Sequence, residues 1–215
     1  MGGLLAAPVR AQVDHSAAVW TSVTPTARLS SDVDVALEVH SRYTDDLSRL
    51  GQVLVRPGVT WRVRDRLSLA TGYVYTRNRP AGRGANDEHR AWQQFTLTLL
   101  DVQGGPQLTA RTRLEQRWRE GAAGTAWRLR EQVRAQAPLR SGDGVALFVA
   151  NEWLVHLNGT EWTRAGVDQV RFAAGLSVPL SDRLRLEPGY LNIVGVRPGT
   201  DDMQHIATAH LNWRL

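Results

Sequence analysis

Arginine and glutamate recur at alternate positions in two neighbouring segments, and these rows are the first candidates for chemistry. One row runs from Arg111 to Arg119 with Glu115 at its centre, and a second row over residues 128–136 alternates three arginines with two glutamines. A guanidinium donates two parallel hydrogen bonds to a carboxylate and stays charged at neutral pH. The rows therefore predict ion pairs, or an anion-attracting surface, on one face of the protein.

The elements that carry these rows are predicted to be strands. Both segments are rich in Arg, Glu, Gln and Leu, which favour helix, but a helix would scatter alternate positions around its circumference. The same period of two recurs along the whole chain, for example over 33–42 and 207–215. It predicts about eleven strands, at residues 17–29, 33–43, 50–63, 67–77, 88–102, 107–119, 125–138, 144–157, 166–179, 183–195 and 203–215.

The connections between these segments alternate in length. Tight links such as 30–32 and 64–66 alternate with longer ones rich in Gly, Pro, Asp or Asn, such as 77–87 and 158–167. The fold class is therefore predicted to be all-β, an up-and-down antiparallel transmembrane β-barrel of 10–12 strands. Because single-chain bacterial barrels normally have an even strand count, we expect a further strand near residues 12–24 or one strand divided in two.

Composition excludes several classes. The 215 residues suit a single domain over 12–215, and the chain has 26 arginines, no lysine and no cysteine. The absence of cysteine excludes disulfides, thiolate metal sites and a cysteine nucleophile. No apolar run reaches the length of a transmembrane helix. Although the net charge is +5, no exposed basic stripe with interleaved aromatics indicates nucleic acid.

The apolar face of the predicted strands indicates a lipid environment. The strands are long enough to cross a bilayer, and aromatic residues gather near their ends as a girdle. The final strand, HIATAHLNWRL, is similar to the C-terminal assembly signal of outer-membrane proteins, and residues 1–11 are typical of the remnant of an export signal. We therefore expect the bacterial outer membrane, with outer-membrane lipid and the barrel-assembly machinery as partners. The predicted girdle comprises Tyr43, Trp61, Trp118, Trp127, Tyr190 and Trp213.

With the apolar face toward lipid, the charged face lines the lumen. We expect arginines of 107–119 and 125–138 to meet the carboxylates of Glu115, Glu152 and Glu187. Either the ion pairs fill the lumen and hold the barrel shape, or surplus arginine lines a narrow channel that attracts small anionic solutes. The predicted lumen residues are Glu38, Arg42, Arg56, Arg62, Glu88, Arg90, Arg111, Arg113, Glu115, Arg117, Arg128, Arg130, Arg134, Glu152, Arg171, Arg185 and Glu187.

Two other functions stay open. An outer-membrane hydrolase or acyltransferase would place a His–carboxylate pair at the extracellular rim, where Asp87 with His89, His156, and Asp201 or Asp202 with His205 are available. No nucleophile motif accompanies them, so no catalytic residue, metal site or cofactor is predicted. A soluble lipocalin-like carrier is the second alternative, since alternation alone does not say which face points inward.

Six short segments together carry a family resemblance. They are EHRAWQQ at 88–94, RTRLEQR at 111–117, RLR at 128–130, NEW from Asn151, QVR from Gln169 and EPGY at 187–190. In this order they resemble the bacterial family known as domain of unknown function 2490, over nearly all of residues 18–215. The resemblance implies an outer-membrane β-barrel without an established activity and supplies no catalytic residues.

Overall fold

The chain folds into eleven strands in a computed structural model that describes residues 14–45, 47–140, 144–197 and 202–215. All the predicted segments form strands, with ends within a few residues of the predicted ones. The predicted export-signal remnant, residues 1–11, lies outside the described residues. The strands are β1 Asp14–Arg28, β2 Val33–Thr44, β3 Arg49–Arg64, β4 Leu67–Asn78, β5 Asn86–Asp101, β6 Gln107–Arg119, β7 Ala126–Pro138, β8 Ala146–His156, β9 Gly166–Pro179, β10 Leu184–Gly195 and β11 Asp202–Arg214.

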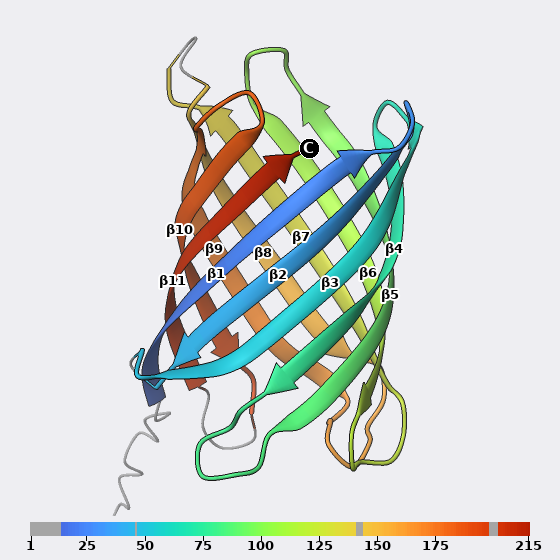
Figure 1. The fold of residues 1–215 in the computed structure, drawn as a ribbon, viewed down its shortest axis with the longest axis vertical. Helices are drawn as coiled ribbons and strands as arrows, with labels where there is room; N and C mark the ends of the chain where they lie inside the picture. Colours follow the sequence, from blue (N-terminus) through green and yellow to red (C-terminus); the bar gives the residue numbers. More distant parts are fainter. Residues whose placement is uncertain (1–13, 46, 141–143, 198–201) are drawn as a thin grey trace, which may run out of the picture.

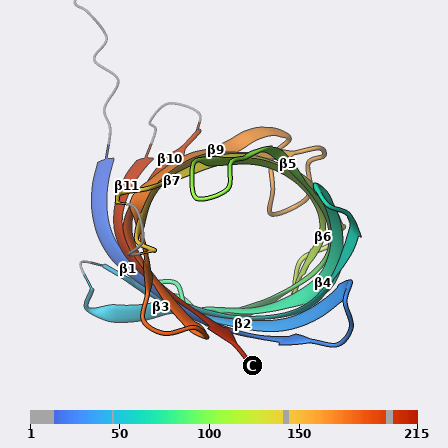
Figure 2. The same cartoon turned by 90° about the horizontal axis from the view of Figure 1, so that it is seen from above.

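The strands close into one barrel in which each is bonded to its neighbours in sequence (Figures 1 and 2). Consecutive strands are antiparallel, whereas β1 and β11 close the barrel as a parallel pair in which Ser22 lies opposite His210. The expectation of an even strand count is therefore wrong for the described residues. An odd number of up-and-down strands leaves the first and last running in the same direction, and a parallel ladder satisfies their edges.

The two ends of the barrel differ. The strands of the pairs β1–β2, β3–β4, β5–β6, β7–β8 and β9–β10 are joined at one end, called here the turn end. The strands of the pairs β2–β3, β4–β5, β6–β7, β8–β9 and β10–β11 are joined at the other, the loop end. The predicted contrast in length has two exceptions, the short link 45–48 and the longer link 139–145. β11 ends at the turn end, and β1 begins at the loop end (Figure 1).

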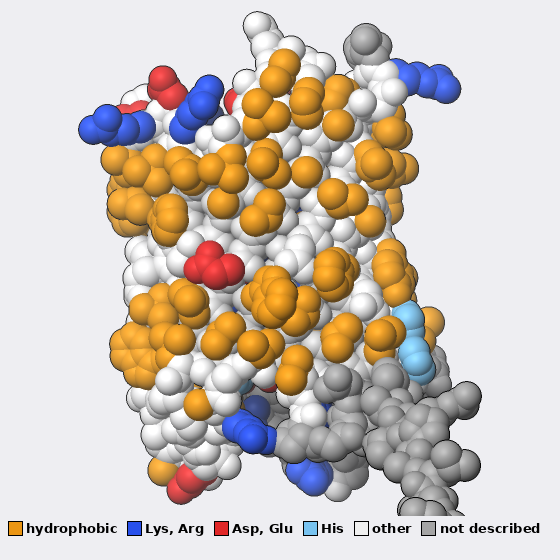
Figure 3. All heavy atoms as spheres, turned by 180° about the vertical axis from the view of Figure 1, so that it is seen from behind, with side chains coloured by type: hydrophobic (Ala, Val, Ile, Leu, Met, Phe, Trp, Pro, Cys, Tyr) orange, Lys and Arg blue, Asp and Glu red, His pale blue; other side chains and the backbone are white. Residues whose placement is uncertain are grey.

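The wall of the barrel is apolar outside and polar inside. Thirty large apolar side chains are exposed among the described residues, Leu37, Phe95, Val149 and Phe172 among them. On the side drawn in Figure 3, hydrophobic side chains spread over most of the height of the wall, and charged side chains lie mainly at the two ends, apart from one acidic side chain near the middle. Eight arginine or glutamate side chains of β5–β8 are buried, although these residue types are almost never fully buried unless paired. The distribution is the reverse of that in a water-soluble globular protein.

Aromatic rings occupy part of the interior where glycines make room for them. A Cβ atom on Gly58 would lie 2.8 Å from Cζ2 of Trp92, and one on Gly72 would lie 2.6 Å from the same atom. On the other side of the barrel, a Cβ on Gly175 would lie 2.8 Å from Cζ of Phe148. The inward-facing glycines therefore let the rings of Trp92 and Phe148 pack close to the wall.

Among the described residues, none forms a helix long and apolar enough to span a bilayer.

Candidate functional site: the charged interior

Alternation along β5–β9 directs every second side chain into the barrel. The register between neighbouring strands then places inward-facing residues of adjacent strands side by side. Glu115 of β6 lies opposite Arg128 of β7, and Glu152 of β8 lies between Gln132 of β7 and Arg171 of β9. Cross-strand partners lie about 5 Å apart at Cβ, within reach of Arg and Glu side chains. The strand pairing thus builds a continuous charged layer.

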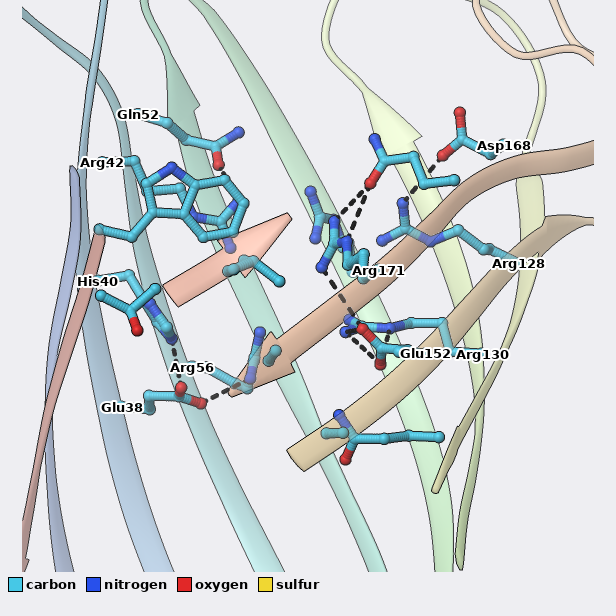
Figure 4. Close-up of a pocket in the computed structure, with 18 of the residues that line it drawn as sticks. Glu38, His40, Arg42, Gln52, Arg56, Arg128, Arg130, Glu152, Asp168 and Arg171 are labelled. Atoms are coloured by element: carbon cyan, nitrogen blue, oxygen red, sulfur yellow. Dashed lines mark hydrogen bonds and ion pairs between the residues drawn. The ribbon is translucent and has the colours of Figure 1, made fainter. Parts of the chain in front are cut away.

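Two glutamates form the centre of this layer. Glu115 accepts hydrogen bonds at Oε2 from Nε and Nη2 of Arg128, at 2.9 and 2.5 Å, and at Oε1 from Arg130 at 3.0 Å. Arg130 also donates to both oxygens of Glu152, at 2.7 and 2.8 Å from Nη2. Glu152 receives a further bond of 2.6 Å from Arg111. Arg130 therefore bridges two buried carboxylates, and each carboxylate is held by more than one guanidinium. Figure 4 shows the contact between Arg130 and Glu152.

Smaller clusters surround this centre. Glu88 accepts from Nε of Arg90 at 2.6 Å and from Nε of Arg117 at 2.7 Å, and Arg117 also contacts His156. On the opposite wall Glu38 pairs with Arg56 at 2.6 Å and with His40. Toward the turn end, Glu187 accepts from Arg134 at 2.9 Å and from the Ser177 hydroxyl at 3.0 Å. All five predicted lumen glutamates are thus ion-paired.

Three interior arginines are held by glutamine amides. Gln94 accepts from Arg113, Gln52 accepts from Arg42 and Gln169 accepts from Arg171, with the shortest bond of each pair at 2.6 Å. Aromatic rings support the same arginines, since the guanidinium carbon of Arg113 lies 4.5 Å from the Trp92 ring centroid and that of Arg42 lies 3.7 Å from Trp20. A guanidinium over a ring face is attracted by the ring quadrupole.

Two cavities occupy what remains of the interior. The larger, of about 700 Å³, extends from the loop end and is lined by eleven arginines but only five acidic residues among the described residues. The smaller, of about 310 Å³, lies at the turn end and is bounded by Asp34, Arg62 and Arg185 among others. No described residue lines both. The larger cavity therefore carries excess positive charge.

Comparison with known proteins gives the family of the chain. The family model described as "Protein of unknown function (DUF2490)" matches residues 17–204. The chain belongs to this family. An uncharacterized protein of Methylorubrum extorquens is similar to it, with 37% identity over 163 residues that make up 75% of this chain and 71% of the relative. No solved structure matches significantly.

The predicted lumen residues of this DUF2490 barrel all lie on the inward face. Arg113 and Glu115 are buried within the charged layer, and Arg62 and Arg185 border the smaller cavity. The others border the larger cavity: Glu38, Arg42, Arg56, Glu88, Arg90, Arg111, Arg117, Arg128, Arg130, Arg134, Glu152, Arg171 and Glu187. The ion pairs join the strands that the sequence analysis expected, with arginines of β6 and β7 on Glu115, Glu152 and Glu187.

The six predicted girdle residues are all exposed on the outer face. Trp118 and Trp127 lie at the loop-end limits of β6 and β7, whereas Trp61 and Trp213 lie near the turn-end limits of β3 and β11. Tyr43 also lies near the loop end of β2, whereas Tyr190 lies near the middle of β10 and not at a strand end.

The candidate catalytic residues at the rim are engaged elsewhere. Arg77 binds both oxygens of Asp87, His89 contacts Tyr73, and His205 lies between His15 and Tyr190. Asp202 pairs with Arg197, and Asp201 lies outside the described residues. Among the described residues no group of three potential metal ligands occurs.

Sequence reasoning missed several interior residues. Ser22 lies 2.7 Å from Nδ1 of His210 inside the barrel, but no carboxylate of the described chain hydrogen-bonds to that imidazole to orient it as a catalytic base. Trp20, Trp92 and Phe148 were not singled out, although each stands in phase with an inward row. Reading the phase of every strand, and not only of the charged ones, would have found them.

Proposed function

We propose that this protein is an integral outer-membrane β-barrel, non-enzymatic, whose lumen is closed by a salt-bridged filling. The observation that carries the proposal is the reversed polarity of the wall, with twenty-two of the thirty exposed large apolar side chains on the strands and the Arg–Glu layer buried inside. Soluble monomers rarely expose contiguous apolar patches above a few hundred Å². In a bilayer these side chains contact lipid and not water, which removes the free-energy cost of exposing them.

The dimensions of the strands support the same proposal. They contain between 11 and 16 residues, and about nine to eleven tilted residues suffice to cross the hydrocarbon core. Closure of the sheet satisfies its backbone hydrogen bonds, which lipid cannot do. The exposed aromatic residues near both strand ends fit the two interfaces of a membrane.

The nature of the interior disfavours a soluble carrier of apolar ligands. Such a carrier would present apolar side chains to its cavity, whereas the larger cavity here is lined by eleven arginines, with Trp20, Phe148 and Leu191 among its few large apolar side chains. The reversed polarity therefore supports the membrane barrel over this alternative.

A closed lumen is favoured over an open pore by the division of the interior. The two cavities share no described lining residue. Trp92 and Phe148 lie against the wall with Arg113 and Arg134 above their rings, the latter at 3.9 Å from the Phe148 centroid. Water and ions would have to displace ion-paired side chains to pass.

A narrow anion-preferring channel is the second candidate, and the excess of arginine in the larger cavity favours it. Planar-bilayer recordings on the purified protein separate the two. The closed barrel predicts no conductance steps at moderate voltage. Conductance steps that prefer anions would contradict the closed barrel and support the channel. In that case Arg113→Glu should weaken the anion preference.

An outer-membrane hydrolase or acyltransferase is tested separately. Envelope lipid profiles with and without the gene should be the same for a non-enzymatic barrel. An acyl-chain or headgroup change that the wild-type gene restores would contradict the non-enzymatic assignment.

A further inference from the structure

Two arginines at the larger cavity have a glutamine amide, and not a carboxylate, as their hydrogen-bond acceptor. Arg42 donates from Nη1 to Gln52, and Arg171 donates from Nε and Nη2 to Gln169. A glutamine oxygen accepts these hydrogen bonds but carries no charge. Arg171 has one carboxylate neighbour at 3.5 Å, Glu152, which Arg130 and Arg111 bind more closely.

The guanidinium groups of Arg42 and Arg171 both lie near the indole of Trp20. Their central carbons lie 3.7 Å (Arg42) and 5.8 Å (Arg171) from the centroid of this buried ring. Both arginines line the larger cavity. Figure 4 shows Arg42 on β2, Arg56 on β3 and Arg171 on β9 converging on one space from different parts of the wall.

Electrostatics around Arg42 favour an anion. The charges that act most strongly on its guanidinium are those of Arg171, Arg90, Arg56 and Arg130, and all four are positive. The Nε atoms of Arg42 and Arg56 are both buried, and neither has a hydrogen-bond partner. Buried charge without a partner is costly, and low-dielectric walls focus the field on an incoming anion.

We propose that Arg42 and Arg171, supported by Trp20, bind the phosphate group of a small water-soluble solute that enters from the loop end. Guanidinium forks match the oxygens of phosphate in pairs, whereas a halide offers no such geometry. A cavity of about 700 Å³ has room for a phosphate and a small organic group attached to it. This proposal rests on the proposed function in one respect, namely that solutes can reach the loop end of the barrel.

Isothermal titration of the full chain, folded in detergent, with inorganic phosphate tests this site. Arg42→Gln and Arg171→Gln are the test variants. Arg62→Gln is the matched control, because it removes the same charge from the turn-end cavity, where Asp34 pairs with Arg62. Each variant is first checked for the heat-modifiable gel mobility of a folded barrel.

Wild-type protein and Arg62→Gln should bind one phosphate with equal affinity, and either test variant should bind about tenfold more weakly or worse, the effect of losing one charged hydrogen bond. Chloride at the same ionic strength should compete poorly. Equal binding by wild-type and test variants, absence of binding, or equal competition by chloride would overturn the proposal. Because two test variants are available, the failure of one to fold leaves the test intact. Membrane location and conductance are separate readouts, so the barrel assignment stands or falls independently.

Discussion

Arg130 and Glu131 are consecutive residues of β7 that lie on opposite faces of the barrel wall. The guanidinium of Arg130 is buried between Glu115 and Glu152, while the carboxylate of Glu131 is exposed outside and accepts a hydrogen bond of 2.8 Å from Thr112. Glu131 lies near the middle of its strand, between the apolar Leu129 and Val133. The pair makes the polarity of the wall testable at single-residue level.

Glu131→Leu is expected to stabilise the protein in a bilayer. A carboxylate on the lipid face near the midplane is unfavourable, and removing it should raise the free energy of unfolding by about 1 kcal/mol. Urea unfolding in lipid vesicles, followed by tryptophan fluorescence, measures this. A clear loss of stability would contradict a lipid-facing position.

Glu115→Gln should have the opposite effect. The change leaves Arg128 and Arg130 without one of their buried counter-charges and should lower the free energy of unfolding by about 3 kcal/mol. The same unfolding experiment measures it. Glu120→Gln, the same change at an exposed position between β6 and β7, is the control and should stay within about 0.5 kcal/mol. Equal effects of the two variants would show that the buried charged layer does not stabilise the barrel.

Most of the fold could be predicted from the sequence because period two is a direct consequence of strand geometry. The strand limits and the Arg–Glu faces followed from it. The parallel closure of β1 on β11 could not, because it depends on the register of strands far apart in the chain. The position of Arg171 near Trp20 has the same origin, since β9 approaches β1 only through closure, whereas Arg42 lies directly opposite Trp20 in the β1–β2 hairpin. The outward position of Glu131 can be predicted from the sequence, because Glu131 does not belong to the alternate row that contains Arg128 and Arg130.

The close packing of Trp92 on Gly58 predicts a coupled pair. Gly58→Ala places a methyl group 2.8 Å from Cζ2 of Trp92 and should destabilise the barrel by about 1–3 kcal/mol through overpacking. In a Trp92→Ala background the space is open, so the same glycine change should cost much less. The double-mutant cycle from urea unfolding gives the coupling free energy. Additive effects would mean that the ring does not occupy this niche.

Engineered cysteines test the parallel closure, because the chain contains no cysteine of its own. Thr21 of β1 lies opposite Ala209 of β11, so Thr21→Cys with Ala209→Cys should form a disulfide under mild oxidation. Thr21→Cys with Leu211→Cys is two residues out of register and should cross-link poorly. Non-reducing gel mobility gives the result. Preferential cross-linking of the second pair would contradict this register.

The most direct measurement of the central claim is where the protein resides after cell fractionation. A barrel with an apolar outer face and a charged interior should sediment with the outer membrane, resist extraction by alkaline carbonate and enter solution only with detergent. It should then show the heat-modifiable mobility of a folded barrel. Recovery of folded protein from the soluble fraction without detergent would contradict the account.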